Sequence, residues 1–246
     1  MGRSRVAAAG ESAAGTVRAN VEQASGGVST VVEAVKPKLR GWIHAGMFPL
    51  VLAAVIVLVA LSPTTPAKVS TAVFGLSSIL LFGVSAVYHR GTWSPRVTGV
   101  LRRVDHSNIF LIIAGTCTPL AVLLLDSDTA RVALWIVWVG AFLGLTGRVI
   151  WLGAPRWVYT PVYVALGCVN LIFLPQFGKA GGAAVVWLVV GGGIAYILGA
   201  VVYAMKRPNP SPRWFGFHEV FHALTVAAFV LHSVGIWLAV YGSTPT

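Results

Sequence analysis

The sequence contains few charged residues, few acidic residues and almost no cysteine. Only 10% of its 246 residues are charged while 57% are hydrophobic, which excludes an ordinary soluble domain and indicates a polytopic membrane protein. The two cysteines, Cys117 and Cys168, both lie within apolar segments, so we expect no disulfide framework and interpret them as small helix-interior residues. No apolar core of the signal-peptide type precedes His44.

The formal net charge of +11 does not indicate a nucleic-acid partner. The lysines and arginines fall in the segments between apolar runs rather than in one patch. This distribution is typical of residues that set membrane topology and contact anionic lipid headgroups. We therefore expect a membrane lipid or lipid-like substrate, anionic headgroups bound by basic cytoplasmic loops, and no nucleic acid.

Seven apolar runs follow the polar first 40 residues. Each is close to the ~20 residues that a membrane helix needs, and the connections are short and carry Pro, Gly, Ser or charge. The sequence therefore predicts an all-α fold, a seven-helix transmembrane bundle over residues 41–246. Pro161 and Pro175 are expected to bend the fifth run or to mark its ends. The runs cover residues 44–62, 68–89, 106–125, 130–151, 157–177, 183–205 and 217–241.

Residues 1–40 form a basic arm that precedes the bundle. Small apolar residues recur from Val17 to Val35 at alternating spacings of four and three, which fits a weak amphipathic helix on the membrane surface. Gly26-Gly27 interrupts this pattern and Pro37 limits it, so a partly disordered arm fits equally well. Either interpretation gives a cytoplasmic arm without a core of its own.

The basic residues predict the orientation of the chain in the cell membrane. Of the 18 lysines and arginines, all but three lie in the arm or after the second, fourth and sixth runs. Segments rich in Lys and Arg stay on the cytoplasmic side, so we expect a cytoplasmic N-terminus and an extracytoplasmic C-terminus. The basic residues expected on the other side are Lys68, Arg131 and Lys179.

Three histidines, one aspartate and one serine are expected to share one depth in the bilayer. In the predicted topology the second run ends at His89, the third starts near Asp105 and the seventh starts at His218. His222 is four residues after His218 and shares its helix face, and Ser85 lies one turn deeper than His89. Ionisable side chains within membrane spans are costly, so this cluster indicates a functional site.

Three imidazoles with a nearby carboxylate suit a zinc site that keeps one position open for water. We therefore predict zinc as the cofactor, with His89, His218 and His222 as its ligands. Zinc lowers the pKa of bound water to ~7, so Asp105 would accept a proton from that water or hold it in place. Ser85 would orient the water or polarise a substrate carbonyl. In the alternative interpretation, Asp105 only caps its helix and Ser85 only bonds back to its own helix.

The segment His218–His222 reads HEVFH and also fits the H-E-x-x-H pattern of zinc proteases. Glu219 would then be the general base, and Asp105 and Ser85 would have no assigned part. If Asp105 serves the water instead, we expect Glu219 to be a surface or headgroup-level charge. Glu219→Gln separates the two interpretations.

Three other histidines are weaker candidates. His44 and His106 fall near the same membrane face and are read as further ligands or as headgroup contacts. His232 lies about 15 Å beyond His222 along the helix, too far to share the same ion.

Three motifs occur in order on the second, third and seventh predicted helices: SAVYH (Ser85–His89), DHSNIFLIIAGTCTP (Asp105–Pro119) and HEVFHALTVAAFVLH (His218–His232). Together they resemble the haemolysin III family, which belongs with the progestin and adipoQ receptors and, more distantly, the alkaline ceramidases. The likeness covers about residues 40–241. It implies seven helices with the N-terminus inside and zinc held by the histidines that match His89, His218 and His222. It also implies a serine and an aspartate near the metal, which match Ser85 and Asp105.

The residues and the resemblance leave three functions open. The leading prediction is a haemolysin III-like membrane protein whose zinc site, near the cytoplasmic face, hydrolyses a lipid amide. The alternatives are a lytic or membrane-homeostasis protein without turnover, and a lipid-sensing, receptor-like protein with structural zinc. The sequence has no regular polar stripe that would line a wide aqueous pore, so pore formation ranks below lipid chemistry.

Overall fold

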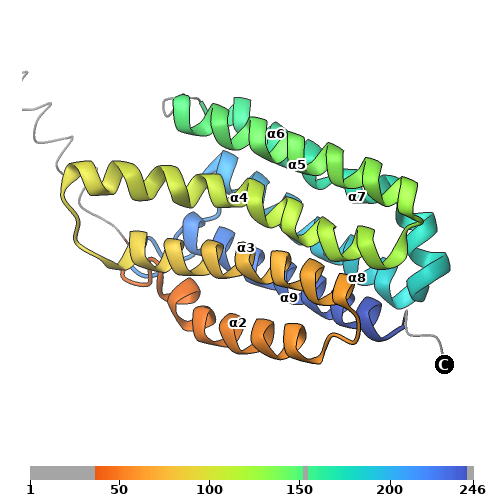
Figure 1. Ribbon diagram of the computed structural model, residues 1–246. Helices are drawn as coiled ribbons and strands as arrows, with labels where there is room; N and C mark the ends of the chain where they lie inside the picture. Colours follow the sequence, from red (N-terminus) through yellow and green to blue (C-terminus); the bar gives the residue numbers. More distant parts are fainter. Residues whose placement is uncertain (1–36, 152–154, 243–246) are drawn as a thin grey trace, which may run out of the picture.

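A computed structural model describes residues 37–151 and 155–242, and in these ranges every named element is a helix. The predicted arm falls largely on residues 1–36, outside the described part. Figure 1 shows the long helices lying side by side in one bundle. They are α2 (Trp42–Leu61), α3 (Thr65–Arg90), α4 (Pro95–Leu124), α5 (Ser127–Ile150), α6 (Arg156–Gly167), α7 (Val169–Ile172), α8 (Leu174–Met205) and α9 (Phe217–Gly242).

Short polar connections start three of these helices. The side chain of Thr64 accepts a hydrogen bond from the N–H of Ala67 at 3.3 Å, and Ser94 caps α4 in the same way at 3.4 Å. Asp126 caps α5 by accepting from the N–H of Thr129 at 3.0 Å. Such caps satisfy the free amides of a first helical turn, so the turn signals of the sequence locate the helix starts.

The helices have the length and surface of membrane spans. Among the described residues, α2, α3, α4, α5, α8 and α9 are each long and apolar enough to cross a membrane. Their outward faces carry many large apolar side chains, more than the surface of a water-soluble protein exposes. The chain is therefore a polytopic helical membrane protein, as predicted. Examples of these outward side chains are Trp135, Phe142, Leu143, Ile150 and Trp187.

The fifth predicted run is not one continuous helix. Residues 157–177 are divided among α6, α7 and the beginning of α8. The amide of Phe173 bonds the carbonyl of Asn170, three residues back, at 3.2 Å, which tightens the turn between α7 and α8. Pro175 lies in the first turn of α8, where its missing N–H costs nothing, so it marks a helix start. The apolar stretch Trp157–Ile172 is shorter than the six long helices.

Small residues allow the helices to approach one another closely. An added Cβ on Gly75 of α3 would collide with Val55 of α2, and one on Gly144 of α5 would collide with Phe110 of α4. Gly192 of α8, the middle residue of the run Gly191–Gly193, packs against the ring of His232. Close approach at small residues is how membrane helices gain packing contacts without a hydrophobic driving force.

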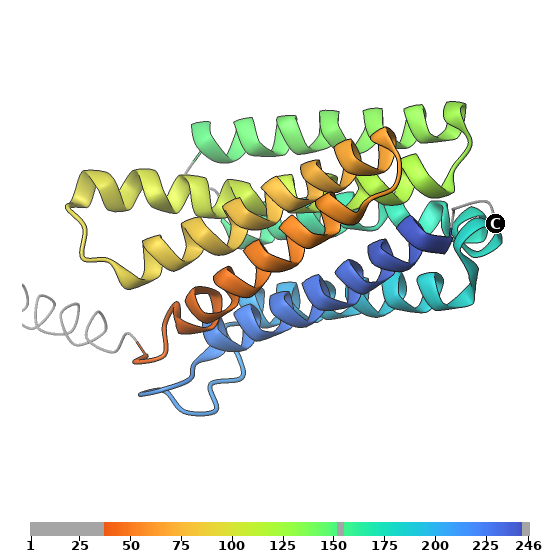
Figure 2. The same ribbon diagram turned by 60° about the horizontal axis from the view of Figure 1, so that its bottom comes forward.

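One end of the bundle brings together three connecting segments of the chain. The amides of Lys38 and Leu39 bond the carbonyls of Arg213 and Trp214, at 3.0 and 3.2 Å. The start of α2, the α3–α4 connection and the α8–α9 connection therefore lie at the same end, which Figures 1 and 2 also show. We call this end, formed by residues 37–41, 91–94 and 206–216, the basic end. The last described turn of α9 lies at the opposite end (Figure 1).

We expect Gly75→Ala to lower the thermal unfolding temperature of the detergent-purified protein. The new methyl group would overlap the stiff side chain of Val55, and overpacking of this kind costs about 1–3 kcal/mol. Gly46→Ala on α2 is the matched control, because a Cβ there meets nothing within 4 Å. Equal melting temperatures for the two variants would contradict the close packing of α2 on α3.

Candidate metal centre

Three histidine side chains from two helices meet at the basic end. His89 comes from the last turn of α3, and His218 and His222 come from the first turns of α9. Each ring offers a nitrogen, and the three nitrogens all lie within 4.8 Å of one another. The Nε2 atoms of His89 and His218 are 3.2 Å apart. Side chains that are far apart in sequence thus converge at one depth, as the topology argument requires.

The backbone around these rings is built for close approach. His218 and His222 are four residues apart on α9, so both project from one face of the helix. Gly41 precedes α2 with a φ of 81°, and a Cβ there would lie 2.6 Å from the Cβ of His89. A residue with a side chain would meet both backbone strain and a collision at this position. Gly41 therefore allows the N-terminal segment to pass directly against the histidine cluster.

Asp105 and Ser85 lie beside the histidines. The Oδ2 atom of Asp105 is 3.9 Å from the Nε2 atom of His89. Ser85 is buried, and its hydroxyl lies within hydrogen-bonding reach of the Asp105 carboxylate. The serine is therefore placed to hold a carboxylate that faces the imidazoles. All five residues named by the sequence analysis as metal ligands or catalytic groups are close together.

The donor set of the cluster fits zinc. Zn–N bonds are about 2.0–2.1 Å, so the nitrogens of a tetrahedral site lie about 3.3 Å apart. The 3.2 Å between His89 and His218 matches this separation, and the third nitrogen lies within 4.8 Å of both. Three neutral imidazoles that leave one position open, with a carboxylate nearby, are typical of catalytic rather than structural zinc.

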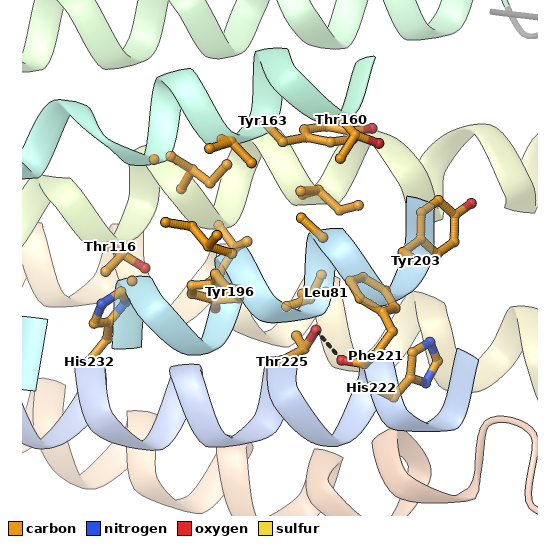
Figure 3. Close-up of a pocket in the computed structure, with 18 of the residues that line it drawn as sticks. Leu81, Thr116, Thr160, Tyr163, Tyr196, Tyr203, Phe221, His222, Thr225 and His232 are labelled. Atoms are coloured by element: carbon orange, nitrogen blue, oxygen red, sulfur yellow. Dashed lines mark hydrogen bonds between the residues drawn. The ribbon is translucent and has the colours of Figure 1, made fainter. Parts of the chain in front are cut away.

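A cavity of about 230 Å³ extends from this cluster into the bundle. Ser85, Asp105, His218 and His222 line its end nearest the basic end of the molecule. Figure 3 shows His222 and Tyr203 at one end of the cavity and His232 and Thr116 at the other. Most of the wall between them consists of aliphatic and aromatic side chains. Examples are Leu81, Ile109, Ile112, Val164, Ile194 and Phe221.

The family model described as "Haemolysin-III related" matches residues 32–233, most of the chain. The chain belongs to the haemolysin-III-related family. The matched range includes all three histidines of the cluster as well as Asp105 and Ser85. The resemblance seen in the three sequence motifs is therefore confirmed at the level of the family.

Individual relatives support the same family. A hemolysin-3 homolog of Bacillus subtilis (strain 168) is 31% identical over 151 residues, which are 61% of this chain and 70% of the relative. Hemolysin-3 of Bacillus cereus is 28% identical over 58% of this chain and 65% of its own length. The adiponectin receptor protein of Drosophila melanogaster is 25% identical over 70% of this chain, but the match spans only 43% of that receptor.

Glu219 in this haemolysin-III-related protein is not the surface charge that we expected. Its side chain is only 1% exposed, one carboxylate oxygen is ion-paired with Arg40, and the other accepts from the N–H of Gly216 at 2.8 Å. The expectation failed because the segment before α2 folds over the start of α9. Both oxygens serve this contact, which favours a structural part for Glu219 over that of the H-E-x-x-H base.

Two further histidines, His44 and His106, make contacts that their spacing in the sequence did not indicate. The buried ring of His44 stacks on that of His222, with centroids 3.8 Å apart and planes 5° apart. His106 donates from Nδ1 to the carbonyl of Arg102 at 2.6 Å, so its Nε2 accepts from the hydroxyl of Tyr203 at 3.2 Å. His44 thus supports a member of the cluster from behind, and His106 faces the rim of the cavity.

We expect Glu219→Gln to destabilise the protein without removing its metal-binding capacity. The substitution breaks a buried ion pair and weakens the cap on α9, a loss of about 1–3 kcal/mol of unfolding free energy. The measurement is the thermal unfolding temperature together with zinc content.

Asp128→Asn is the matched control, because Asp128 pairs with Arg131 on the surface, where its side chain is 86% exposed and such pairs contribute little. Normal stability of Glu219→Gln combined with loss of hydrolytic activity would instead favour the protease-like interpretation.

Proposed function

We propose that this protein holds zinc with His89, His218 and His222 and hydrolyses an amide or ester bond of a membrane lipid. The observation that carries the proposal is the meeting of three imidazoles and a carboxylate at the end of an apolar cavity. Such a cavity suits an acyl chain, because burying apolar surface is the main favourable term in binding one. The polar cluster then lies where the headgroup linkage of that lipid would be.

Each polar group has a task in this reaction. When bound, zinc supplies Lewis acidity, which polarises a carbonyl and makes water acidic enough to lose a proton near neutral pH. The Asp105 carboxylate accepts that proton and can return it to the leaving group. Ser85 keeps the carboxylate oriented by its hydrogen bond. The apolar wall excludes other water, which strengthens every charge interaction at the site.

The proposal includes seven membrane crossings with the N-terminus in the cytoplasm. The start of α2, the end of α3 and the start of α9 all lie at the basic end. The end of α5 meets the start of α6 there too, since Arg148 stacks on the ring of Tyr159. The chain must cross once more before α8 can return to the start of α9, and the stretch Trp157–Ile172 is available to do so. Its length is near the ~17-residue lower limit for a span.

The basic residues support this orientation. Arg40, Arg90, Arg102 and Arg103 belong to segments at the basic end, as do the residues that connect α8 to α9. Because segments rich in Lys and Arg stay in the cytoplasm, the metal cluster would lie near the cytoplasmic face of the cell membrane. Anionic lipid headgroups are the natural partners of these arginines.

We expect the purified protein to contain about one zinc per chain by elemental analysis. His89→Ala and His218→Ala should reduce zinc to the background level, because each removes a ligand from a site of three. His106→Ala is the matched control: this ring lies at the same end but bonds Arg102 and Tyr203. Full zinc in the ligand variants, or loss of zinc in the control alone, would overturn the assignment.

We expect Asp105→Asn to abolish turnover while zinc is retained. The amide cannot accept the proton, and removal of a general base typically lowers a rate by roughly 100-fold or more. The assay follows release of a fluorescent acyl chain from matched amide and ester lipids in proteoliposomes. Asp128→Asn, on the exposed start of α5, should leave the rate unchanged. Unchanged turnover in Asp105→Asn would contradict the proposed base.

A lytic function is the second candidate, because two relatives carry the name hemolysin-3. The same proteoliposomes, loaded with dye, distinguish the two functions. Dye release that persists when all three histidines are replaced would favour membrane perturbation, and acyl release that requires them would favour hydrolysis. Lipid and zinc binding without either signal would favour the receptor-like function to which the name of the Drosophila relative points.

A further inference from the structure

The end of the cavity farthest from the histidine cluster contains a second histidine site. His232 is buried, and it lies ten residues after His222 on α9, about 15 Å along the helix. One ring nitrogen, Nε2, is 3.0 Å from the carbonyl oxygen of Val189 on α8. The ring packs directly against Gly192, where a Cβ would collide with it. The position of His232 is therefore fixed by α8, and its ring cannot reach the metal ligands.

The hydrogen bond to Val189 determines what the other ring nitrogen can do. A carbonyl oxygen only accepts, so Nε2 carries the proton and donates it. In a neutral imidazole Nδ1 is then an acceptor with a free lone pair. Among the described residues, Nδ1 of His232 has no hydrogen-bond partner although it is buried. The far end of the cavity thus presents an acceptor that a donor group must satisfy.

Two other residues of the cavity wall also have a buried polar atom without a partner in the described part of the chain. The hydroxyl of Tyr196 is buried without a partner in the described part of the chain, and its ring centroid lies 5.6 Å from that of His232. On α7, Oδ1 of Asn170 is buried and likewise unpaired within the described ranges. All three residues line the cavity. Buried polar atoms are nearly always hydrogen-bonded in native proteins, so a group that enters the cavity is expected to complete this set.

We propose that the far end of the cavity binds a hydroxyl group on the tail of an amphipathic lipid ligand. A hydroxyl can donate to Nδ1 of His232 and accept from the hydroxyl of Tyr196 at the same time. The apolar wall between the two ends holds the hydrocarbon chain that connects this hydroxyl to the polar head. The site therefore selects hydroxylated chains of matching length over plain ones. This inference deepens the proposed function, because it takes the ligand's head to lie at the metal cluster.

The test compares two ligands that differ by one oxygen. Dodecanoic acid and its ω-hydroxy derivative are titrated against the full-length protein in nanodiscs, by displacement of a fluorescent fatty acid. In the extended derivative, the two polar ends lie about as far apart as His222 and His232. We expect the hydroxylated acid to bind roughly tenfold tighter, because a site built for a hydroxyl loses affinity when its polar groups stay unpaired.

The variants separate the far end from the rest of the cavity. Tyr196→Phe removes a single unpaired oxygen, and His232→Phe removes the acceptor but keeps a ring against Gly192. Each should reduce the preference to about unity. Tyr203→Phe is the matched control, because its hydroxyl lies at the opposite end beside His106 and the preference should survive. Because Tyr196→Phe alters so little volume, its result stands even if His232→Phe fails to fold.

Several results would overturn the inference. They are equal affinity of the wild type for the two acids, a preference that survives both far-end substitutions, and failure of both acids to bind. In the last case, water alone would hydrogen-bond the buried polar atoms of His232, Tyr196 and Asn170. The titration is repeated on His89→Ala, which lacks a metal ligand. In the wild type, a preference without any acyl release would disprove the proposed enzyme but keep the hydroxyl site, and acyl release without any preference would do the reverse. In His89→Ala the preference should persist while acyl release is lost.

Discussion

The contact between His89 and His218 is the interaction on which the site depends. Their Nε2 atoms, 3.2 Å apart, join the last turn of α3 to the first turn of α9. Ionisable side chains within a membrane are costly unless they are paired or bind an ion inside the protein. The pair therefore fixes the relative depth of two helices that are distant in sequence. Ser85 on α3 and His222 on α9 reach the cluster because those two helices are held at this depth, and Asp105 joins them from α4.

A second layer of contacts keeps the start of α9 in place. The ion pair of Arg40 with Glu219, the bond from Gly216 and the backbone bonds of Lys38 and Leu39 tie the N-terminal segment to α9. The buried carboxylate is acceptable only because both of its oxygens have partners. The segment before α2 thus contributes to the site without supplying a ligand. A substitution in it would act on the cluster through the position of α9.

Much of the fold could be predicted from the sequence, because a membrane span must be apolar for nearly its whole length. Six of the seven runs each correspond to one named helix, although α4 begins at Pro95, ahead of its run, and α8 is kinked at Gly182, just before the sixth run. The fifth does not, since hydropathy cannot detect the tight turns at Cys168 and Phe173, where local hydrogen bonds rather than polarity end each helix. The prolines were the only sign of a break in the sequence, and they were expected to bend the run or to mark its ends. Pro175 does lie at a helix start.

The candidate site was predictable for a different reason. Counting the predicted membrane crossings gives the level at which each helix begins and ends in the bilayer. That level was sufficient to group His89, Asp105 and His218. Counting does not give the rotation of a helix about its axis. The stacking of His44 on His222 and the burial of Glu219 both depend on that rotation and on the path of residues 37–41, so neither could be predicted. The interpretation of His44 as a ligand or headgroup contact did not foresee that its buried ring stacks on His222.

The break in the helix between α6 and α8 and the cavity are linked by one physical requirement. Within a bilayer, backbone that is not regular helix is tolerated only where it is buried in protein or lines a cavity. The residues around the break, Gly167, Cys168, Asn170 and Leu171, do line the cavity. On the opposite side the wall is α9, a continuous helix that carries His222 and His232 at a separation set by the helical rise. The cavity thus has one rigid wall that defines the distance between its polar ends. Its other wall contains the break between α6 and α8.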